Sequence, residues 1–488
     1  MAALQIACYT ASIASCIIFG CIALLLSHRL REKNKDAEFF ITARGSQTTL
    51  QVACTFYAAN MGAWTMFSIP SYATTAGLIG IVFYCIALSF PIFFVAFVGG
   101  KIQRQFPRVL SFSHYAYLRF GPVIQGFVGV VMLFNMGVNL SVCYTSIGDF
   151  FESIVGASRI LVILVIACST LVYTATGGLI VSLITDQIQA LSSLVFVVTM
   201  VIYVAVSFPR KALEDNPFPN SLKPDPMGYG SIGVMPISMI AWAVYYEGMW
   251  QRVWASANDR SLKYGVLLSG LVTILVLFFF GFCACLVIWA KWYPEDNSDS
   301  NTVMFLILSH GMKQAPTWIL TFVALLASTM CQSAVDGYQN ALVDCVTSIL
   351  LKGKSMWWGR LAVLIINIPI IIVALEGYPV LNLYLLANLV ATCCGPPVLL
   401  GTFKQIKDYV TTASVLFGCF TAFMSILVYG YLQMDHDVLK GLHYCFFVSY
   451  NYPQFVIALC SSVIGVFVWG VPAKLIFGPP ECRVFEKE

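Results

Sequence analysis

Residues 55–72 read TFYAANMGAWTMFSIPSY, and this stretch sets the interpretation of the whole chain. It lies in an apolar run long enough to cross a bilayer, yet Asn60 and Gly62 stand near the middle of the run and Pro70 follows. Glycine favours departures from helical geometry and proline removes a backbone donor, so we expect a helix that is interrupted inside the membrane. Such a break frees carbonyl and amide groups that can bind a ligand.

A second stretch carries the same kind of signal. Residues 239–256 read MIAWAVYYEGMWQRVWAS, with Gly248 next to Glu247 and aromatic residues on both sides, so we expect another interrupted helix. The two stretches lie five membrane runs apart, which is the spacing at which the halves of a five-plus-five inverted repeat would begin. The alternative is that both glycines only let neighbouring helices pack closely, as small residues often do in membranes.

The composition places the chain in a membrane. Of its 488 residues, 59% are hydrophobic and 10% are charged, whereas about a quarter of the residues in soluble domains are charged. Apolar runs of about 20 residues recur along the whole length, and each can cross a bilayer core. The first run, 5–27, is too long for a signal peptide and lacks its flanks, so we expect a true span. The sequence predicts an all-α polytopic membrane protein without a separate soluble domain.

Loop signals and charges divide the chain into about thirteen spans. With the N-terminus outside, about 20 of the 27 Lys and Arg residues fall on the cytoplasmic side, which is the usual orientation bias. The C-terminus is then cytoplasmic, and we expect the plasma membrane. Because the positive charges lie in short loops, they indicate orientation and no nucleic-acid partner. The expected runs are 5–27, 47–75, 76–99, 121–149, 156–177, 182–207, 231–251, 264–290, 316–347, 359–376, 378–402, 409–433 and 453–475.

Nothing in the sequence indicates an enzyme. The sequence has no metal-ligand cluster, nucleophile elbow or phosphate loop and only 5 His residues, so we expect neither an enzyme nor a bound cofactor. The 17 cysteines are scattered through apolar runs without a metal-binding pattern. They are best explained as small packing residues.

Polar groups inside two further runs point to an ion. Ser328 and Thr329 are consecutive hydroxyls near the middle of the run 316–347, and sodium is well served by hydroxyls and helix-end carbonyls. Such a pair more often bonds back to carbonyls of its own helix. Asp186, near the start of the run 182–207, is the acid that would mark an ion path, unless it lies at the cytoplasmic rim as a solvated residue.

Five short segments of the sequence contain further motifs that can be compared with those of known proteins. They are AEFFITARGSQ at 37–47, AANMGAW at 58–64, YTATGGLIVSLITDQIQA at 173–190, QRVWASAND at 251–259 and LLAST at 325–329. Their order and spacing resemble the sodium:solute symporter family, which includes bacterial proline and sugar symporters and the urea transporters of fungi and plants. In the first segment Glu38 replaces the family's usual Asp. The stretch LYLLANLVATCCGPPVLLG is similar to the fungal urea-transporter-like branch.

The resemblance implies a LeuT-like core of ten helices, preceded by one helix and followed by two. We therefore expect five parts. They are an additional helix with a cytoplasmic loop (1–46), a first five-helix repeat (47–207), an extracellular loop (208–230), a second five-helix repeat (231–402) and two C-terminal helices with a cytoplasmic tail (403–488).

The resemblance also implies sodium as the coupling ion, held between the first and eighth core helices by main-chain and hydroxyl oxygens. Asp186 matches an acid on the ion pathway of relatives. Sodium is then the only metal that we expect. The implied sodium ligands are Ala58, Met61, Leu325, Ser328 and Thr329.

We expect transport by alternating access of a small polar solute, enclosed by aromatic and polar side chains near the interrupted stretches. Only Glu247 among the candidates would be costly to bury without a purpose, whereas the aromatic residues could equally serve helix packing. Urea, a related small amide or a polyamine is favoured by the resemblance of LYLLANLVATCCGPPVLLG to the fungal urea-transporter-like branch. Asn60 weakens a proline substrate, because the proline branch has an acid at this position, although the sugar branch also has Asn there. The solute candidates are Asn60, Trp64, Thr65, Tyr84, Tyr245, Tyr246, Glu247, Trp250 and Tyr384.

Three alternatives remain open at this stage. Glu247 or Asp186 could carry a proton, which would make the coupling ion a proton instead of sodium. The solute could be of the proline or sugar type. The chain could also sense a solute without transporting it, as a transceptor does. In each case the partners are a small polar solute, an ion and membrane lipid, and the sequence does not indicate an oligomeric state.

Overall fold

The computed structural model is built almost entirely of helices. It describes residues 2–30, 39, 42–107, 109–224, 226–294, 300–309, 315–350, 356–447 and 453–478. The longer elements and the two halves of broken helices are α1 (Ala2–Arg29), α3 (Thr49–Asn60), α4 (Thr65–Gln105), α6 (Pro122–Asp149), α7 (Arg159–Ser207), α9 (Pro226–Val244), α10 (Glu247–Ala255), α11 (Asp259–Trp289), α12 (Thr317–Leu350), α13 (Met356–Leu375), α14 (Val380–Leu400), α15 (Thr412–Gln433) and α17 (Pro453–Phe477). The shorter ones are α5 (Phe112–Phe120), α8 (Lys211–Glu214), α16 (Val438–Phe447), η2 (Phe150–Val155), η3 (Asn220–Leu222), η4 (Ser300–Ile307) and η5 (Lys404–Ile406).

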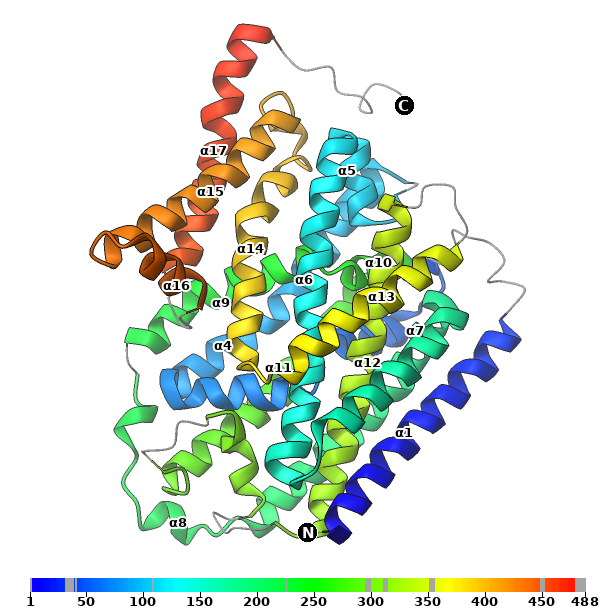
Figure 1. The fold of residues 1–488 in the computed structure, drawn as a ribbon, viewed down its shortest axis with the longest axis vertical. Coiled ribbons are helices and arrows are strands. Elements are labelled where there is room, and N and C mark those ends of the chain that lie inside the picture. Colours follow the sequence, from blue (N-terminus) through cyan, green and yellow to red (C-terminus); the bar gives the residue numbers. More distant parts are fainter. Residues whose placement is uncertain are drawn as a thin grey trace.

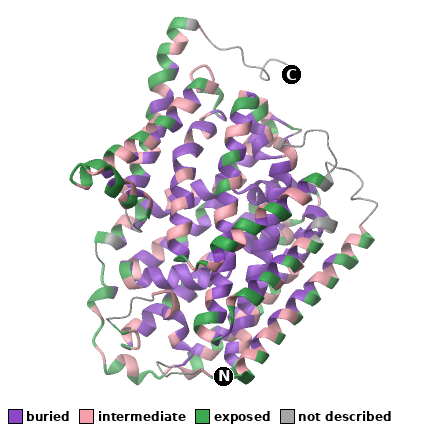
Figure 2. Ribbon diagram, in the orientation of Figure 1, coloured by how far each residue is buried: buried purple, intermediate pink, exposed green. Residues whose placement is uncertain are grey.

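The helices have the length and the surface of a membrane protein. In the described part, nine helical stretches are long and apolar enough to cross a bilayer, and three shorter apolar helices accompany them. Buried residues fill the interior of the bundle, while exposed ones follow its outside (Figure 2). Large apolar side chains are among the exposed ones, including Phe97 at 75% and Leu475 at 81%, an arrangement that lipid favours over water. The chain is an integral membrane protein.

Two of the long helices change direction close to a boundary between two predicted spans. The backbone of α4 turns at Gly77, where φ is 59° and ψ is −163°. That of α7 turns at Gly178, where φ is 65° and ψ is −173°. This backbone region is almost exclusive to glycine. The two turns lie close to the predicted boundaries between the runs 47–75 and 76–99 and between the runs 156–177 and 182–207. In Figure 1, α1 begins at the lower end of the molecule and α17 finishes at the upper end.

Replacing Gly77 by alanine is expected to lower the free energy of unfolding by about 1–3 kcal/mol, the usual cost of a side chain in this backbone region. A Cβ there would also lie 3.0 Å from the carbonyl oxygen of Ser221. Gly100→Ala in the same helix is the matched control, because a Cβ at Gly100 meets nothing within 4 Å. Thermal unfolding of the purified variants measures the difference. Equal melting temperatures for the two variants would show that the turn at Gly77 tolerates a side chain.

The helix that the sequence predicts to be interrupted near Asn60 and Gly62 is interrupted there. α3 ends at Asn60, and Met61 is extended, with φ −106° and ψ 127°. The next helix, α4, begins at Thr65. A Cβ at Gly62 would lie only 2.5 Å from the Trp64 ring, so glycine lets that ring fold back against the break.

The second interruption lies before the predicted glycine. α9 ends at Val244, Tyr246 is extended with φ −102° and ψ 97°, and Gly248 lies inside α10. A Cβ at Gly248 would come within 2.6 Å of the Tyr246 ring. The prediction of a broken helix is confirmed, but the role of Gly248 is corrected, because this residue makes room for a ring of the break and does not form the break itself.

A short parallel bridge joins the two broken helices at one end. The backbone N–H of Gln47, just before α3, donates to the carbonyl oxygen of Ala255 at 2.9 Å. The carbonyl oxygen of Gln47 accepts from the N–H of Ala257 at 2.9 Å. The start of α3 is thereby fastened to the end of α10, which brings the first helices of the two halves together.

Candidate functional site

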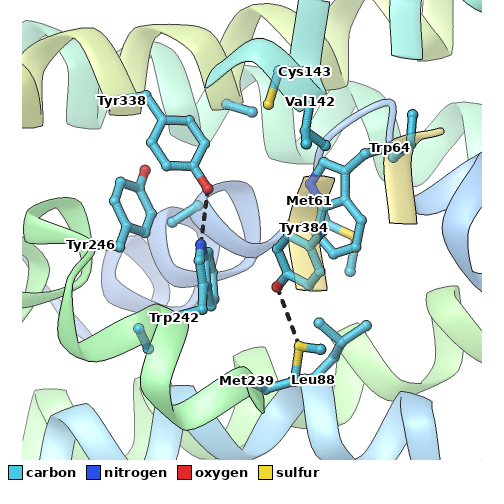
Figure 3. Close-up of a cluster of buried hydrophobic side chains, with 14 of the residues drawn as sticks. Met61, Trp64, Leu88, Val142, Cys143, Met239, Trp242, Tyr246, Tyr338 and Tyr384 are labelled. Carbon is cyan, nitrogen blue, oxygen red and sulfur yellow. Dashed lines mark hydrogen bonds between the residues drawn. The ribbon is translucent and has the colours of Figure 1, made fainter. Parts of the chain in front are cut away.

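Five aromatic side chains meet where the two broken helices face α12 and α14. Trp64 comes from the first break, Trp242 from the end of α9, Tyr246 from the second break, Tyr338 from α12 and Tyr384 from α14 (Figure 3). We call these five residues the aromatic cluster. The centroids of Tyr246 and Tyr338 are 4.4 Å apart and those of Trp64 and Tyr384 are 5.1 Å apart. All five are at most 4% exposed, so the rings close the centre of the bundle.

The polar atoms of the aromatic cluster are only partly paired. Trp242 Nε1 donates to the Tyr338 hydroxyl at 3.1 Å, and the Tyr384 hydroxyl donates to Met239 Sδ at 3.2 Å (Figure 3). The Tyr246 hydroxyl is buried and has no hydrogen-bond partner among the described residues. Ring faces attract organic cations, and a free hydroxyl can bind a polar group of a ligand. The aromatic cluster therefore has the chemistry to hold an amine or another small polar solute.

Sequence reasoning found three members of the aromatic cluster and missed two. Trp64, Tyr246 and Tyr384 are among the predicted solute candidates. Trp242 lies one helical turn before Tyr246, and that spacing could have drawn attention to it. Tyr338 gives no signal of its own, because only the packing of α12 against the second break brings it near.

Three other predicted solute candidates gather around the start of α5. Both carboxylate oxygens of Glu247 accept from the backbone N–H of Phe112, at 3.0 and 3.2 Å. The Trp250 ring stacks on the Phe112 ring with centroids 4.7 Å apart, and Tyr245 meets the same ring edge-on. The first amides of a helix need partners, and a carboxylate is a favourable one. In this structure, Glu247 anchors α5, which is a purpose for its burial other than solute binding.

The last three candidates support the first break. Asn60 Nδ2 donates to the carbonyl oxygen of Leu88 at 2.7 Å, while Asn60 Oδ1 has no partner among the described residues. The Thr65 hydroxyl donates to the carbonyl oxygen of Gly62 at 2.8 Å, which satisfies a group that the break sets free. Tyr84 packs edge-on against Tyr72 with centroids 5.3 Å apart. Of the three, Asn60 keeps an oxygen available for a ligand.

The five predicted sodium ligands lie on two elements that pack together. Ala58 and Met61 are buried at the end of α3, and the other three are on α12. A Cβ built on Gly62 would lie 3.3 Å from the Ala334 Cβ, so the break contacts α12 just beyond these residues. Ser328 and Thr329 are buried. The donors are neutral oxygens, a set that suits a monovalent hard cation.

One of these hydroxyls is held by the additional N-terminal helix. Ser328 Oγ lies 2.7 Å from Ser12 Oγ of α1, and both residues are buried. One turn further along the contact between α1 and α12, Gln332 Nε2 donates to the Ser15 hydroxyl at 3.1 Å. Figure 1 shows α1 running along the outside of the bundle beside α7. The sequence did not predict these contacts between α1 and α12, because serines are common in apolar helices and the sequence does not indicate their partners.

Asp186 forms a buried ion pair. Arg252 Nη2 donates to the Asp186 carboxylate at 2.6 Å, and the two side chains are 1% and 0% exposed. The Ser333 hydroxyl donates to the same carboxylate at 2.7 Å. Arg252 also donates to the carbonyl oxygens of Thr55 and Gly248, at 2.8 and 2.6 Å. Asp186 is thus not a solvated residue at a rim, and Arg252, which sequence reasoning did not single out, ties it to both broken helices.

A second buried acid, Asp336, lies on α12 one turn after Ser333. The Asp336 carboxylate accepts from the hydroxyls of Thr174 and Ser182, at 2.6 and 2.5 Å, and from Asn340 Nδ2 at 2.9 Å. These three donors are neutral. Thr174 and Ser182 lie on either side of the turn at Gly178, so Asp336 fastens that turn to α12. An acid with such partners can hold either a charge or a proton.

Comparison with known proteins identifies the family. The sequence profile described as the Sodium:solute symporter family matches residues 40–406. The chain belongs to the sodium:solute symporter family. A spermidine transporter of Candida albicans, strain SC5314, DUR31, is 24% identical over 410 residues, which are 84% of this chain and 77% of that protein.

Solved structures of symporters share the fold of this family member. A Na⁺-coupled sialic acid symporter in a substrate-bound outward-open state superposes with a TM-score of 0.73 at 16% identity, over 98% of this chain and 99% of that one. Mhp1, a nucleobase-cation-symport-1 family transporter in a closed conformation, superposes with a TM-score of 0.60 at 11% identity, over 91% and 96% of the chains.

These comparisons confirm several predictions made from the sequence. The family is the expected one, and the fold is LeuT-like. As a member of the sodium:solute symporter family, the protein is a solute transporter and not an enzyme, and its family uses sodium as a coupling ion and not as a cofactor.

Proposed function

We propose that this protein is a sodium-coupled symporter that imports small organic cations of the polyamine type in preference to neutral urea and small amides. The aromatic cluster carries this proposal. A cation over the face of a Trp or Tyr ring gains about 2 kcal/mol when the site excludes water, and five such rings converge here. The likeness to a spermidine transporter supports the same solute class.

In the proposed mechanism, sodium binds first, between the first break and α12. Its ligands are Ala58, Met61, Leu325, Ser328 and Thr329, and the ion fixes the position of α3 relative to α12. Because Trp64 belongs to the same break and Tyr338 to the same α12, sodium binding also sets the spacing of the aromatic cluster. Coupling is then a binding free energy that the ion and the solute share. Asp186 and Arg252 move with the broken helices as access alternates.

The decisive experiment is uptake into proteoliposomes that contain the purified full chain. Labelled spermidine, urea, proline and a hexose are each offered with an inward sodium gradient or with choline in its place. We expect spermidine to accumulate above protein-free vesicles only with the sodium gradient. Accumulation of urea alone would overturn the solute class. Binding of a solute without accumulation under any gradient would favour a sensor instead of a transporter.

Replacing Trp242 by leucine is expected to raise the KM for spermidine roughly 30-fold, which corresponds to the loss of about 2 kcal/mol of cation–π attraction. Trp250→Leu is the matched control, because Trp250 is equally buried but stacks on Phe112 outside the aromatic cluster. It should lower the stability of the protein and leave the KM of the folded fraction unchanged. Equal KM values for both variants would contradict the assignment of the aromatic cluster to the solute.

A proton-coupled transporter is the second candidate, and Asp336 is the observation that favours it. Its carboxylate accepts from three neutral donors, so protonation would break no ion pair that involves this residue. Uptake driven by an inward proton gradient in choline buffer, and abolished by Asp336→Asn, would establish proton coupling. We expect instead that the proton gradient drives no uptake without sodium.

We also propose the orientation and the division of the chain that the sequence indicates. The N-terminus would be extracellular and the C-terminus cytoplasmic, in the plasma membrane, with the two five-helix repeats at 47–207 and 231–402. Protease or antibody access to a tag at each terminus in intact cells tests the orientation. A tag at the C-terminus that is accessible without permeabilisation would overturn it.

A further inference from the structure

A groove opens on the outer surface of the bundle between α4 and α11. Its volume is about 640 Å³, and it lies apart from the aromatic cluster and from the proposed sodium ligands. The lining side chains on α4 recur every three or four residues, and so do those on α11, so each helix contributes one face. They are Phe93, Ala96, Phe97, Gly100, Lys101 and Arg104 from α4 and Asp259, Leu262, Lys263 and Val266 from α11.

The groove is apolar at one end and basic at the other. Phe93 and Phe97 lie on the outer surface, 12 and 8 residues before the end of α4 at Gln105 and thus further from that end than the basic residues. They are 39% and 75% exposed. Lys101 and Arg104 lie in the last turns of α4, and Lys263 lies in the first turns of α11, which begins at Asp259. The groove therefore runs from the edge of the membrane core into it, with its positive charges at the edge.

The basic end has an excess of positive charge. Three cationic side chains and one acidic one line the groove, which leaves a net charge of +2. Arg104 and Asp259 form an exposed ion pair at 2.5 Å. Lys101 Nζ lies 3.9 Å from the centre of the Phe403 ring, which holds the ammonium group at the mouth of the groove without neutralising it. An anion is the ligand that this end lacks.

The floor of the groove is open at Gly100. A Cβ built there meets nothing within 4 Å, although Gly99, the preceding residue, is packed closely against Val253. A chain-like ligand can therefore lie along α4 past Gly100, between the exposed phenylalanines and the lysines. The size, the apolar end and the basic end all suit an amphipathic molecule.

We propose that this groove binds one anionic phospholipid, with its phosphate between Lys101 and Lys263 and an acyl chain along Phe93 and Phe97. Basic pockets between membrane helices bind anionic headgroups in this way, and each Lys or Arg near an anionic membrane surface contributes about 1 kcal/mol. A soluble phosphate compound would contact only the basic end of the groove and make no contact with Phe93 and Phe97. Under the proposed orientation the lipid belongs to the cytoplasmic leaflet. The site is independent of the solute and of the coupling ion.

Native mass spectrometry of the full chain tests the proposal by counting the lipids that stay bound. The purified protein is titrated with phosphatidylserine, with phosphatidylcholine and with soluble glycerophosphoserine. We expect one phosphatidylserine to bind with higher affinity than phosphatidylcholine, and glycerophosphoserine not to compete. The Lys101→Gln, Lys263→Gln double variant should bind phosphatidylserine about 30-fold more weakly, since two lysines contribute about 2 kcal/mol. Lys474→Gln, at the end of α17, should bind as the unmodified chain does.

A blocking variant separates lipid binding from a loss of charge. Gly100→Phe should fill the floor of the groove and remove the bound phosphatidylserine with all charges intact. Gly126→Phe in α6 is the matched control, because a Cβ at Gly126 also meets nothing within 4 Å. Monodisperse gel-filtration profiles establish that both variants are folded. Retention of one phosphatidylserine by folded Gly100→Phe, equal binding of the two lipids, or displacement by glycerophosphoserine would each overturn the proposal.

Discussion

Replacing Ser328 and Thr329 together by alanine is expected to raise the sodium concentration for half-maximal uptake at least about 100-fold. Each hydroxyl that binds a charged partner contributes about 1.5–3 kcal/mol, and 1.4 kcal/mol corresponds to a factor of ten. Both residues are buried on α12, so no water replaces the lost oxygens easily. The sodium dependence of solute uptake into proteoliposomes measures the shift, and thermal unfolding shows that the variant is folded.

The contact between Ser328 and α1 allows a graded version of this test. If Ser328 donates its proton to Ser12, 2.7 Å away, its lone pairs are free to face the cation. Ser12→Ala removes this support, and loss of a partner behind a metal ligand typically costs 10–100-fold in affinity. We therefore expect a shift of about tenfold, smaller than that of the double variant. Ser15→Ala is the matched control, because its partner Gln332 is not among the proposed ligands.

The order of these effects decides between two explanations. A sodium site between α3 and α12 requires the double variant to shift most, Ser12→Ala to shift less and Ser15→Ala to leave sodium dependence unchanged. Equal shifts for Ser12→Ala and Ser15→Ala would mean that both act only through the packing of α1 on α12. An unchanged sodium dependence in the folded double variant would remove both hydroxyls from the ion site.

Much of the fold could be predicted because the local sequence is enough to specify a membrane span. A run of apolar residues specifies a span, and the break after Asn60 occurs where a polar amide side chain and a nearby glycine make a continuous helix unfavourable. The turns at Gly77 and Gly178 likewise need a residue without a Cβ. The second break was predicted in the right helix but assigned to Gly248, because the sequence does not tell a glycine that bends a backbone from one that makes room for Tyr246.

The candidate site was harder to predict, since it depends on pairs that are far apart in the chain. Glu247 could be recognised as an acid that needs a reason to be buried, but its partner is Phe112, 135 residues away. No local pattern distinguishes Arg252 from other basic residues, and only the fold reveals its pairing with Asp186. Tyr338 and Trp242 share a hydrogen bond that no local pattern predicts. The sequence pattern therefore predicted the two helix breaks and the pair of hydroxyls, whereas the hydrogen-bond and ion-pair partners depend on how the helices pack.

Replacing Arg252 by glutamine is expected to destabilise the protein by about 3–5 kcal/mol, because it leaves the buried Asp186 carboxylate without its cationic partner. No residual solvation offsets the loss, as the two side chains are 1% and 0% exposed. The carbonyl oxygens of Thr55 and Gly248 also lose a charged donor. Chemical unfolding of the purified protein measures the change. Arg104→Gln is the matched control, because its ion pair with Asp259 is exposed and such pairs contribute about 0–1 kcal/mol.

The double variant Arg252→Gln, Asp186→Asn separates a structural pair from one that takes part in transport. Removing both charges abolishes the cost of an unpaired buried charge, so most of the lost stability should return, and the coupling between the two sites appears as non-additivity. The pair links α7 to α10 and, through Thr55, to α3. Under the proposed mechanism, it therefore lies across a contact that rearranges when access alternates. We expect the folded double variant to bind sodium and solute but to transport slowly, whereas uptake at the unmodified rate would leave the pair with a purely structural role.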